Sequence, residues 1–234
     1  ADYYESKKKL ITSQGENDKA IFNRDDPLVW ALRKEGKFKV YAFSRKEHVS
    51  PGCFIHGDRI VLSDKKEDEL MKISEIPLFG IHNQENVMAS ALAGYILGVP
   101  LPRIRGSVME FSGLEHRLEK VLTVRGIDFY NDSKATNVDA AMKSIQSFDR
   151  NIILILGGRD KGGDFLVLSQ AVKERVKKII LIGEAKGKIK RALKDTVAMK
   201  SVSSMREAVR FGFSKAVPGD IILLAPACTS FDMF

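Results

Sequence analysis

Three apolar runs in the second half of the chain constrain its fold more than any other feature. They lie in residues 152–156, 178–182 and 221–225, and a glycine or a proline follows each one. Strands that are apolar on both faces belong to parallel sheets covered by helices. Segments with helical apolar spacing separate the runs, beginning at Asp164, Lys186 and Ser204. This alternation predicts an α/β domain with a parallel sheet and right-handed crossovers.

Polar and glycine-rich loops follow the predicted strands. In an open parallel sheet the carboxyl ends of the strands share one edge, and ligands bind in the crevice beside it. Lysines and hydroxyls next to glycine-rich turns suit carboxylate and phosphate groups. The loops are 131–137, 157–164, 183–187 and 226–232, and their polar residues include Asp132, Lys134, Thr136, Arg159, Asp160, Lys161, Thr229 and Ser230. The sequence therefore predicts a site for an anionic ligand at this edge, without naming a reaction.

The loop at 131–137 is the most informative of these segments. It follows an alternating apolar run, 121–130, which predicts strands joined near Arg125-Gly126. It precedes a segment with helical spacing that begins at Val138. Asp132 can accept from a pair of sugar hydroxyls, and Lys134 can reach a phosphate or a carboxylate. Thr136 and Asn137 are better placed to cap the helix, so we expect Asp132 to face the crevice. The alternative is a capped turn with solvated charges.

Shorter elements are predicted in the first half of the chain. Strands are expected at 19–22 and 39–43, a hairpin at 53–62, and a helix from Ile81 that ends at Gly98. The charge-rich stretch 64–72 is typical of a solvated surface.

A linker is predicted where proline and glycine recur, in residues 101–114. We therefore place the domain boundary near Ser112, which gives a first domain of residues 1–112 and a second of residues 113–234.

The bulk properties narrow the class of protein. The formal charge is +8, and the lysines and arginines are spread along the chain, which suits an anionic small-molecule substrate. No nucleic-acid-binding motif occurs, and no apolar run is long enough to span a membrane. Cys53 and Cys228 are far apart and suit free thiols in a reducing compartment. We expect a cytoplasmic monomer whose partners are small molecules, with no nucleic acid and no membrane.

Several segments match one enzyme family, and they occur in the family's order. The string 131–137 resembles the signature loop of the Mur ligases of peptidoglycan synthesis, in the form typical of members that add D-glutamate. Segments 157–165 and 224–232 are similar to two later segments of that family. His82–Asn86 and Leu114–Arg117 resemble its helix-opening and His-Arg motifs. The resemblance covers residues 80–234 well and residues 1–79 more loosely.

The resemblance implies both a fold and a reaction. Residues 1–112 would be the latter part of a P-loop-type α/β central domain that binds ATP. Residues 113–234 would be a C-terminal Rossmann-like, mostly parallel sheet with helices on both faces, which binds the amino acid. The implied reaction forms an amide bond between UDP-N-acetylmuramoyl-L-alanine and D-glutamate through an acyl phosphate, in cytoplasmic peptidoglycan precursor synthesis. Its cofactors would be ATP and Mg²⁺.

The resemblance also implies roles for individual residues. Lys134 would be catalytic, close to the nucleotide and the intermediate. The nucleotide would contact Asn83, Asn86, Arg117 and Asp132, with Asn86 on adenine, Arg117 on phosphate and Asp132 on the ribose hydroxyls. D-Glutamate would be held by Thr136, Lys161 and Ser230. For Asn86, simple capping of the helix is the alternative.

The lysine cluster at 7–9 falls where the family places a carbamylated lysine that serves a second magnesium ion. Its spacing to Ile11 points to Lys8, with Lys9 as the second choice. Lys8 would then be catalytic and, if carbamylated, a metal ligand. A solvated lysine cluster is the alternative.

One family motif has no counterpart in the sequence. There is no Walker-type phosphate loop, so we expect a piece of a longer protein that is inactive as a ligase on its own. Two other functions stay open: a non-catalytic nucleotide- or anion-binding module with a Rossmann-like fold, and another Mur-type ligase such as a folylpolyglutamate synthase. The loop 131–137 favours the D-glutamate ligases over both.

Overall fold

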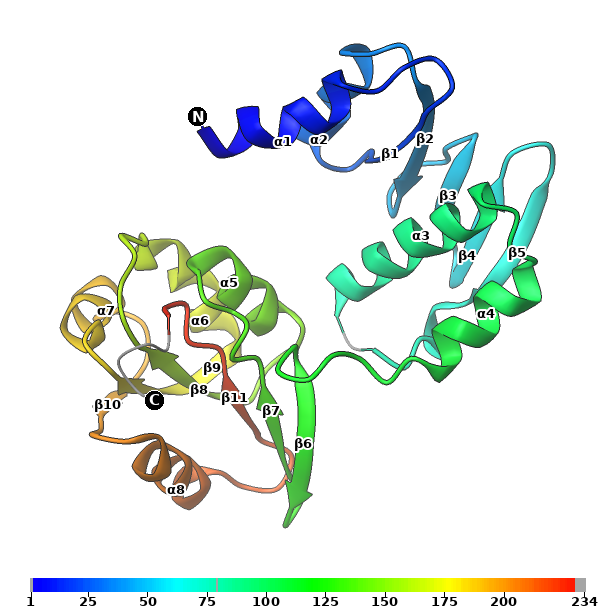
Figure 1. Cartoon of the computed structure of the whole chain (residues 1–234). Coiled ribbons are helices and arrows are strands. Elements are labelled where there is room, and N and C mark those ends of the chain that lie inside the picture. Colours follow the sequence, from blue (N-terminus) through cyan, green and yellow to red (C-terminus); the bar gives the residue numbers. More distant parts are fainter. Residues whose placement is uncertain (1, 79, 230–234) are drawn as a thin grey trace. The chain divides into compact units, whose positions relative to one another are not determined.

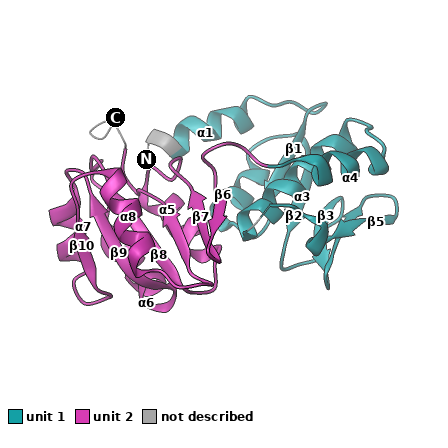
Figure 2. Cartoon of the chain, turned by 90° about the horizontal axis from the view of Figure 1, so that it is seen from below, with its two compact units in different colours: residues 1–112 teal, residues 113–234 magenta. Residues whose placement is uncertain are grey.

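The computed structural model describes residues 2–78 and 80–229, and it divides into two compact units. The first unit is Ala1–Ser112 and the second is Gly113–Phe234 (Figure 2). Each has its own sheet (Figure 1). Each also has its own hydrophobic core.

The second unit is built on a mostly parallel sheet with the strand order β10-β9-β8-β11-β7-β6. Among the named strands of the described residues, only β6 and β7 pair antiparallel, and their turn uses positive φ at Arg125 (52°) and Gly126 (74°). The strands are β6 (Glu119–Val124), β7 (Ile127–Asn131), β8 (Ile152–Gly157), β9 (Val176–Ile182), β10 (Met199–Ser201) and β11 (Ile221–Leu224). The sequence predicted all of these except the short β10.

Helices cover both faces of this sheet (Figure 1). On one face α5, α6, α7 and the 3₁₀ segment η3 pack in a core that includes Ile145, Leu154 and Phe165. On the other face α8 packs through Ala208 and Phe213. The helices are α5 (Val138–Gln146), η3 (Phe165–Leu168), α6 (Ser169–Arg175), α7 (Lys186–Ala192) and α8 (Met205–Lys215). Burial on both faces explains the apolar runs, and the predicted α/β fold class is confirmed.

The first unit contains a mixed sheet with the order β1-β2-β3-β4-β5. β1, β2 and β3 are parallel, whereas β3–β4 and β4–β5 are antiparallel. Its elements are α1 (Asp2–Thr12), β1 (Lys19–Asn23), α2 (Pro27–Ala31), η1 (Leu32–Lys34), β2 (Lys39–Ser44), β3 (Gly52–His56), β4 (Arg59–Ser63), β5 (Glu67–Lys72), η2 (Ile73–Glu75), α3 (Ile81–Ile96) and α4 (Leu101–Glu110). α3 and α4 pack on one face through Met88, Leu92 and Ile104.

Two predictions for this unit were wrong. The charge-rich stretch 64–72 is not only solvated surface, because it contains β5 and buries Leu70 and Met71. Charged side chains are common on an edge strand, where they discourage pairing with other chains. Because β5 contains mostly charged residues, the sequence pattern did not predict it as a strand.

The predicted linker is also mostly helical. α4 occupies Leu101–Glu110, with Pro102 in its first turn and Ile104 buried. Proline is tolerated at that position because the first helical N–H groups have no partner inside the helix. The irregular connection begins only at Phe111.

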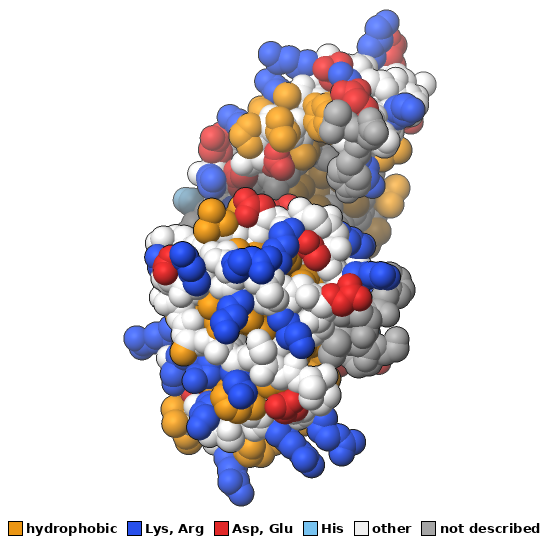
Figure 3. Space-filling model, turned by 90° about the vertical axis from the view of Figure 1, so that its left-hand side faces the viewer, with side chains coloured by type: hydrophobic (Ala, Val, Ile, Leu, Met, Phe, Trp, Pro, Cys, Tyr) orange, Lys and Arg blue, Asp and Glu red, His pale blue; other side chains and the backbone are white. Residues whose placement is uncertain are grey.

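Two further observations concern the length of the helices and the distribution of charge on the surface. No helix in the described part of the chain is long and apolar enough to cross a membrane. On the face shown in Figure 3, Lys and Arg side chains are spread among uncharged ones and do not form one continuous stripe.

Candidate functional site

Backbone hydrogen bonds join the strand-end loops of the second unit. The Asp132 N–H donates to the Leu224 carbonyl (2.8 Å), and the Ala227 N–H donates to the Ala135 carbonyl (2.8 Å). The loop after β7 is therefore fixed to the segment after β11, its parallel neighbour.

The segment after β11 is fixed in turn to the loop after β8. The N–H of Gly157 donates to the Pro226 carbonyl (2.9 Å), and Arg159 and Thr229 form a two-way backbone bridge. The Ala185 N–H, after β9, donates to the Gly158 carbonyl (2.9 Å). All the loops that the sequence placed at one edge are thus hydrogen-bonded in series.

Close backbone approach explains the glycine pair in this series. Gly157 and Gly158 have φ values of 126° and 140°, which L side chains rarely adopt. A Cβ at Gly157 would lie 2.0 Å from the Ile182 carbonyl oxygen, and one at Gly158 would lie 2.4 Å from that of Thr229. The glycines therefore allow neighbouring strand ends to meet.

The loop 131–137 also rests on the segment that opens the unit. The Lys134 N–H donates to the His116 carbonyl (3.1 Å), and the side chains of Asn131 and His116 are 2.9 Å apart. These contacts leave the Lys134 side chain exposed and Thr136 half-buried. Asn137 caps α5 by accepting from the Ala140 N–H (2.8 Å), as predicted.

Asp132 has a contact that the sequence analysis missed. Its carboxylate accepts a hydrogen bond from the hydroxyl of Ser144, which is buried on α5. Asp132 is therefore hydrogen-bonded to the helix from the loop that follows β7. A serine among the small residues of a helix was the only available signal, and such a serine usually bonds its own backbone.

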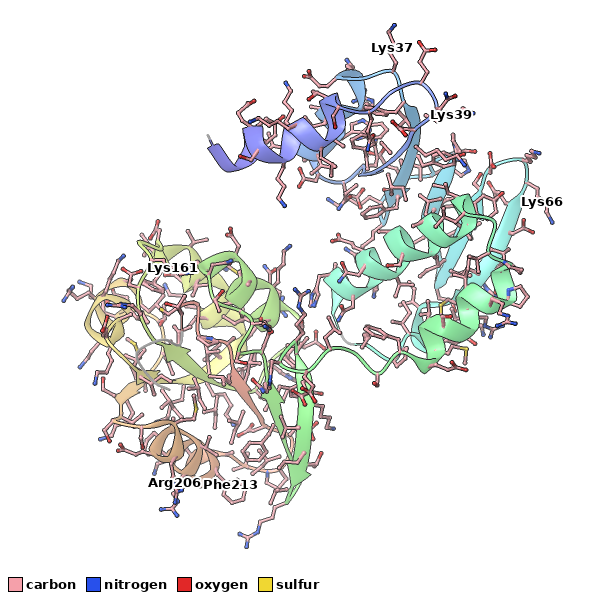
Figure 4. All side chains as sticks on the ribbon, in the orientation of Figure 1. Lys37, Lys39, Lys66, Lys161, Arg206 and Phe213 are labelled. Atoms are coloured by element: carbon pink, nitrogen blue, oxygen red, sulfur yellow. The ribbon has the colours of Figure 1, made fainter. Side chains whose placement is uncertain are left out.

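Lys161 extends from the glycine-rich loop after β8 and is exposed. Figure 4 shows it on the opposite side of the second unit from Arg206 and Phe213 of α8. A Cβ on Gly163 would lie 2.8 Å from Val138 Cγ2. The loop of Lys161 thus packs directly on the start of α5, two residues beyond Thr136.

Arg117 lies in the turn that precedes β6, between His116 (φ 67°) and Leu118 (φ 45°). Its N–H donates to the Leu114 carbonyl (3.1 Å), and its side chain is exposed. Because His116 contacts the loop 131–137, Arg117 is carried on the same edge of the unit.

The remaining sequence-predicted residues divide between the first unit and the undescribed part of the chain. Asn86 Nδ2 donates to Asn83 Oδ1 (3.3 Å) in the first turns of α3. Lys8 Nζ lies 3.1 Å from Glu35 Oε2. Ser230 lies outside the described residues.

The environment of Lys8 bears on its expected modification. The hydrogen bond that Lys8 donates to the Glu35 carboxylate is the main cause that raises the pKa of Lys8 above its usual value. A carbamate forms from the neutral amine, so the Glu35 contact opposes modification in the arrangement described. Among the described residues, no group of three or more His, Cys, Asp or Glu side chains could hold a metal ion.

Two family models match the chain. Residues 1–94 match the Mur ligase middle domain, and residues 116–228 match the Mur ligase glutamate ligase domain.

Curated relatives match along nearly the whole chain. A UDP-N-acetylmuramoylalanine--D-glutamate ligase of Koribacter versatilis is 42% identical over 233 residues, which is 99% of this chain and 51% of the relative. The protein of the same name in Solibacter usitatus is 41% identical over 100% of this chain and 52% of its own length. The chain thus spans about half the length of the curated relatives it matches.

Solved structures share the fold. MurF from Acinetobacter baumannii superposes with a TM-score of 0.68 at 16% identity, covering 95% of this chain and 52% of that one. Mycobacterium tuberculosis folylpolyglutamate synthase has a TM-score of 0.69 at 16% identity, with 97% and 57% covered. With two family models that together span most of its length and relatives about 40% identical, the chain belongs to the Mur ligase family.

Proposed function

We propose that this chain is the nucleotide- and amino-acid-binding part of an ATP-dependent ligase that joins D-glutamate to UDP-N-acetylmuramoyl-L-alanine. The observation that carries the proposal is the hydrogen-bonded series of strand-end loops, which brings Lys134, Thr136 and Lys161 to one edge of the second unit. The names of the relatives agree with the same reaction. A cytoplasmic, monomeric enzyme is part of this proposal.

The two units would divide the work. Residues 1–112 would be the latter part of the central domain, with Asn83 and Asn86 contacting the nucleotide and Asn86 on its adenine. Residues 113–234 would be the C-terminal domain, in which Asp132 contacts the ribose and Arg117 a phosphate. The exposed side chains of Asn86 and Arg117 are available for such contacts.

The amino-acid site would lie where the loops after β7 and β8 meet. Lys161 is exposed and carries a positive charge that suits a carboxylate of D-glutamate. Thr136 supplies a hydroxyl from the adjoining loop, and Ser230 is expected to supply another. Fixing the amino acid in this way turns the attack of its amine into an intramolecular step, which is a large source of rate enhancement.

ATP supplies the phosphoryl group that activates the carboxylate of the acceptor, giving an acyl phosphate. The role of Lys134 would be to stabilise negative charge on the phosphoryl oxygens and the intermediate. Its backbone is fixed by His116 while its side chain stays exposed, so a ligand at the strand ends can reach it.

Magnesium belongs to the proposal for the whole enzyme and rests on the family. The described residues offer no acidic or histidine cluster for it, so no step is derived through the ion. Lys8 is proposed as its carbamylated ligand, which requires that Glu35 release the amine. Lys8→Ala and Lys9→Ala in the complete enzyme would separate the two candidates, because only the modified lysine is required for turnover.

Phosphate release and product mass measured on the complete enzyme test the function. We expect turnover that requires ATP, UDP-N-acetylmuramoyl-L-alanine and D-glutamate together, and none when L-glutamate replaces the D-isomer. The isolated 234-residue chain is expected to be inactive, because its sequence has no Walker-type loop. An enzyme that ignores D-glutamate but extends a folate with L-glutamate would contradict the proposal.

A further inference from the structure

We propose that Asp160 and Lys188 are positioning residues for the amino-acid site, because together they fix the turn that carries Lys161. The inference rests on the proposed function, in which Lys161 binds D-glutamate. Neither residue needs to touch the substrate.

The carboxylate of Asp160 closes the turn on both sides of Lys161. Its Oδ1 accepts hydrogen bonds from the N–H groups of Gly162 (2.9 Å) and Gly163 (3.1 Å). Its Oδ2 accepts from Lys188 Nζ (2.6 Å). Lys161 lies in the chain between Asp160, which accepts these bonds, and the two glycines, which donate them. The bonds therefore restrain the backbone of Lys161, while its side chain stays exposed.

Lys188 anchors this turn to elements outside the loop. It lies on α7, which follows the strand-end loop after β9. Its Nζ also lies 5.4 Å from the centroid of the Phe165 ring, which is buried. The ammonium group is therefore held between Asp160 and an aromatic face, an arrangement that stabilises a cation.

The turn has few other restraints. Gly162 has φ 85°, and apart from its chain neighbours no heavy atom of the described residues lies within 4 Å of the place where its Cβ would be. Glycine loses more conformational freedom on ordering than any other residue, so a turn containing two glycines needs side-chain bonds to hold one conformation. Gly163 is the exception, because it packs against Val138 near Thr136. If the turn lost its single conformation, Lys161 would no longer be held close to Thr136, another residue proposed to bind D-glutamate.

Asp160 must be ionised to accept all three hydrogen bonds, and its surroundings favour the ionised form. The Lys188 ammonium is the first cause that holds the pKa of Asp160 below its usual value, followed by the N–H groups of Gly163 and Gly162. With a lowered pKa the accepting carboxylate is present at neutral pH and is lost only as the pH falls through that value. Without Lys188 the pKa of Asp160 rises, so the turn loosens at a higher pH.

Steady-state kinetics of the complete enzyme test the inference. Asp160→Ala and Lys188→Met should raise the KM for D-glutamate about fivefold, the size expected for loss of a side-chain cap, with the KM for ATP unchanged. Lys188→Arg should restore it. Lys190→Met is the matched control, because Lys190 lies on the same helix and its exposed side chain makes no hydrogen bond or ion pair with the residues that the structure describes. Equal effects of Lys188→Met and Lys190→Met would overturn the proposal.

A double-mutant cycle separates positioning from direct binding. If Lys188 acts through the turn, Lys188→Met should add little in a Lys161→Ala background, because the group being positioned is gone. Additive losses would show that Lys188 binds the substrate itself and would overturn the positioning role. Faster amide exchange at Gly162 and Gly163 in Asp160→Ala, without substrate, is the readout that does not depend on activity.

Failure of the inference can be told from failure of the proposed function. An enzyme that never uses D-glutamate contradicts the proposed function. In that case amide exchange at Gly162 and Gly163 still shows whether Asp160 holds the turn in one conformation. An enzyme that uses D-glutamate with an unchanged KM in both variants contradicts only the positioning role. Lys188→Met removes an exposed side chain, so it should fold even if Asp160→Ala does not.

Discussion

The hydroxyl of Ser144, buried on α5, donates to the carboxylate of Asp132 at the end of β7. The same hydroxyl lies 2.9 Å from the Ala140 carbonyl oxygen. A hydroxyl carries one proton, so these two acceptors share it. The bond to Asp132 involves Oδ2, and Oδ1 accepts no hydrogen bond from the residues that the structure describes. Asp132 thus joins the end of β7 to the helix, and its other oxygen is available for the nucleotide contact proposed above.

The first prediction follows from this double role. Asp132→Ala in the complete enzyme should weaken ATP binding and also lower the stability by about 0.5–1.5 kcal/mol, the usual value of one hydrogen bond. Calorimetry with ATP and thermal melting measure the two effects. Ser144→Ala is the control, because it should reproduce the loss of stability while ATP still binds. Unchanged ATP affinity with a lower melting temperature would make Asp132 purely structural.

The second prediction concerns Lys161, which is exposed at the edge where the loops meet. Lys161→Ala in the complete enzyme should raise the KM for D-glutamate about tenfold to a hundredfold, because one charge-assisted contact is worth roughly 1.5–3 kcal/mol. The KM for ATP should change far less. The melting temperature should stay constant, since the side chain is exposed. An unchanged D-glutamate KM would remove Lys161 from the site.

The third prediction tests the close approach at the glycine pair. Gly158→Ala should destabilise the second unit by about 1–3 kcal/mol or more, because its positive φ is strained for alanine and its Cβ would clash with the Thr229 carbonyl. Thermal melting of the second unit measures this. Gly187→Ala is the matched control, since its Cβ would meet only Arg191 Nη1 at 3.7 Å. Equal melting temperatures would contradict the described geometry.

Particular elements show how far the sequence could predict this fold. The runs of β8, β9 and β11 are apolar on both faces, so their burial is visible in the residue types alone. β5 was missed because only Leu70 and Met71 of its residues are buried. α4 was missed because Pro102 and Gly106 are typical of loops, although proline fits a first helical turn.

For the candidate site, the sequence predicted the loops but not the side-chain contacts between them and the helices. The shared edge of parallel strands predicted which loops would meet, and backbone hydrogen bonds join them. Side-chain contacts between segments far apart in the chain could not be predicted from the sequence. The Asp132–Ser144 and Asp160–Lys188 bonds span 12 and 28 residues, and each depends on how a helix packs on the sheet.

The last prediction concerns the amino ends of the strands, where Lys177 is the second residue of β9 and Asp220 directly precedes β11. The Asp220 side chain is almost completely buried, and both of its oxygens lie 2.8 Å from Lys177 Nζ. The Val217 N–H also donates to it (2.9 Å). Lys177→Met would leave a buried carboxylate without its cation, which is a strongly destabilising change.

We expect Lys177→Met to cost about 1–3 kcal/mol, less than for a fully buried pair, because the Lys177 side chain is 43% exposed and water screens it. Lys173→Met, on the exposed face of α6, is the control and should change stability little. Because Lys177 lies at the amino ends of the strands, the KM values for ATP and D-glutamate should not change. A KM that rises with Lys177→Met at a temperature where the enzyme is folded would show that the site depends on the whole sheet and not on its loop-bearing edge alone.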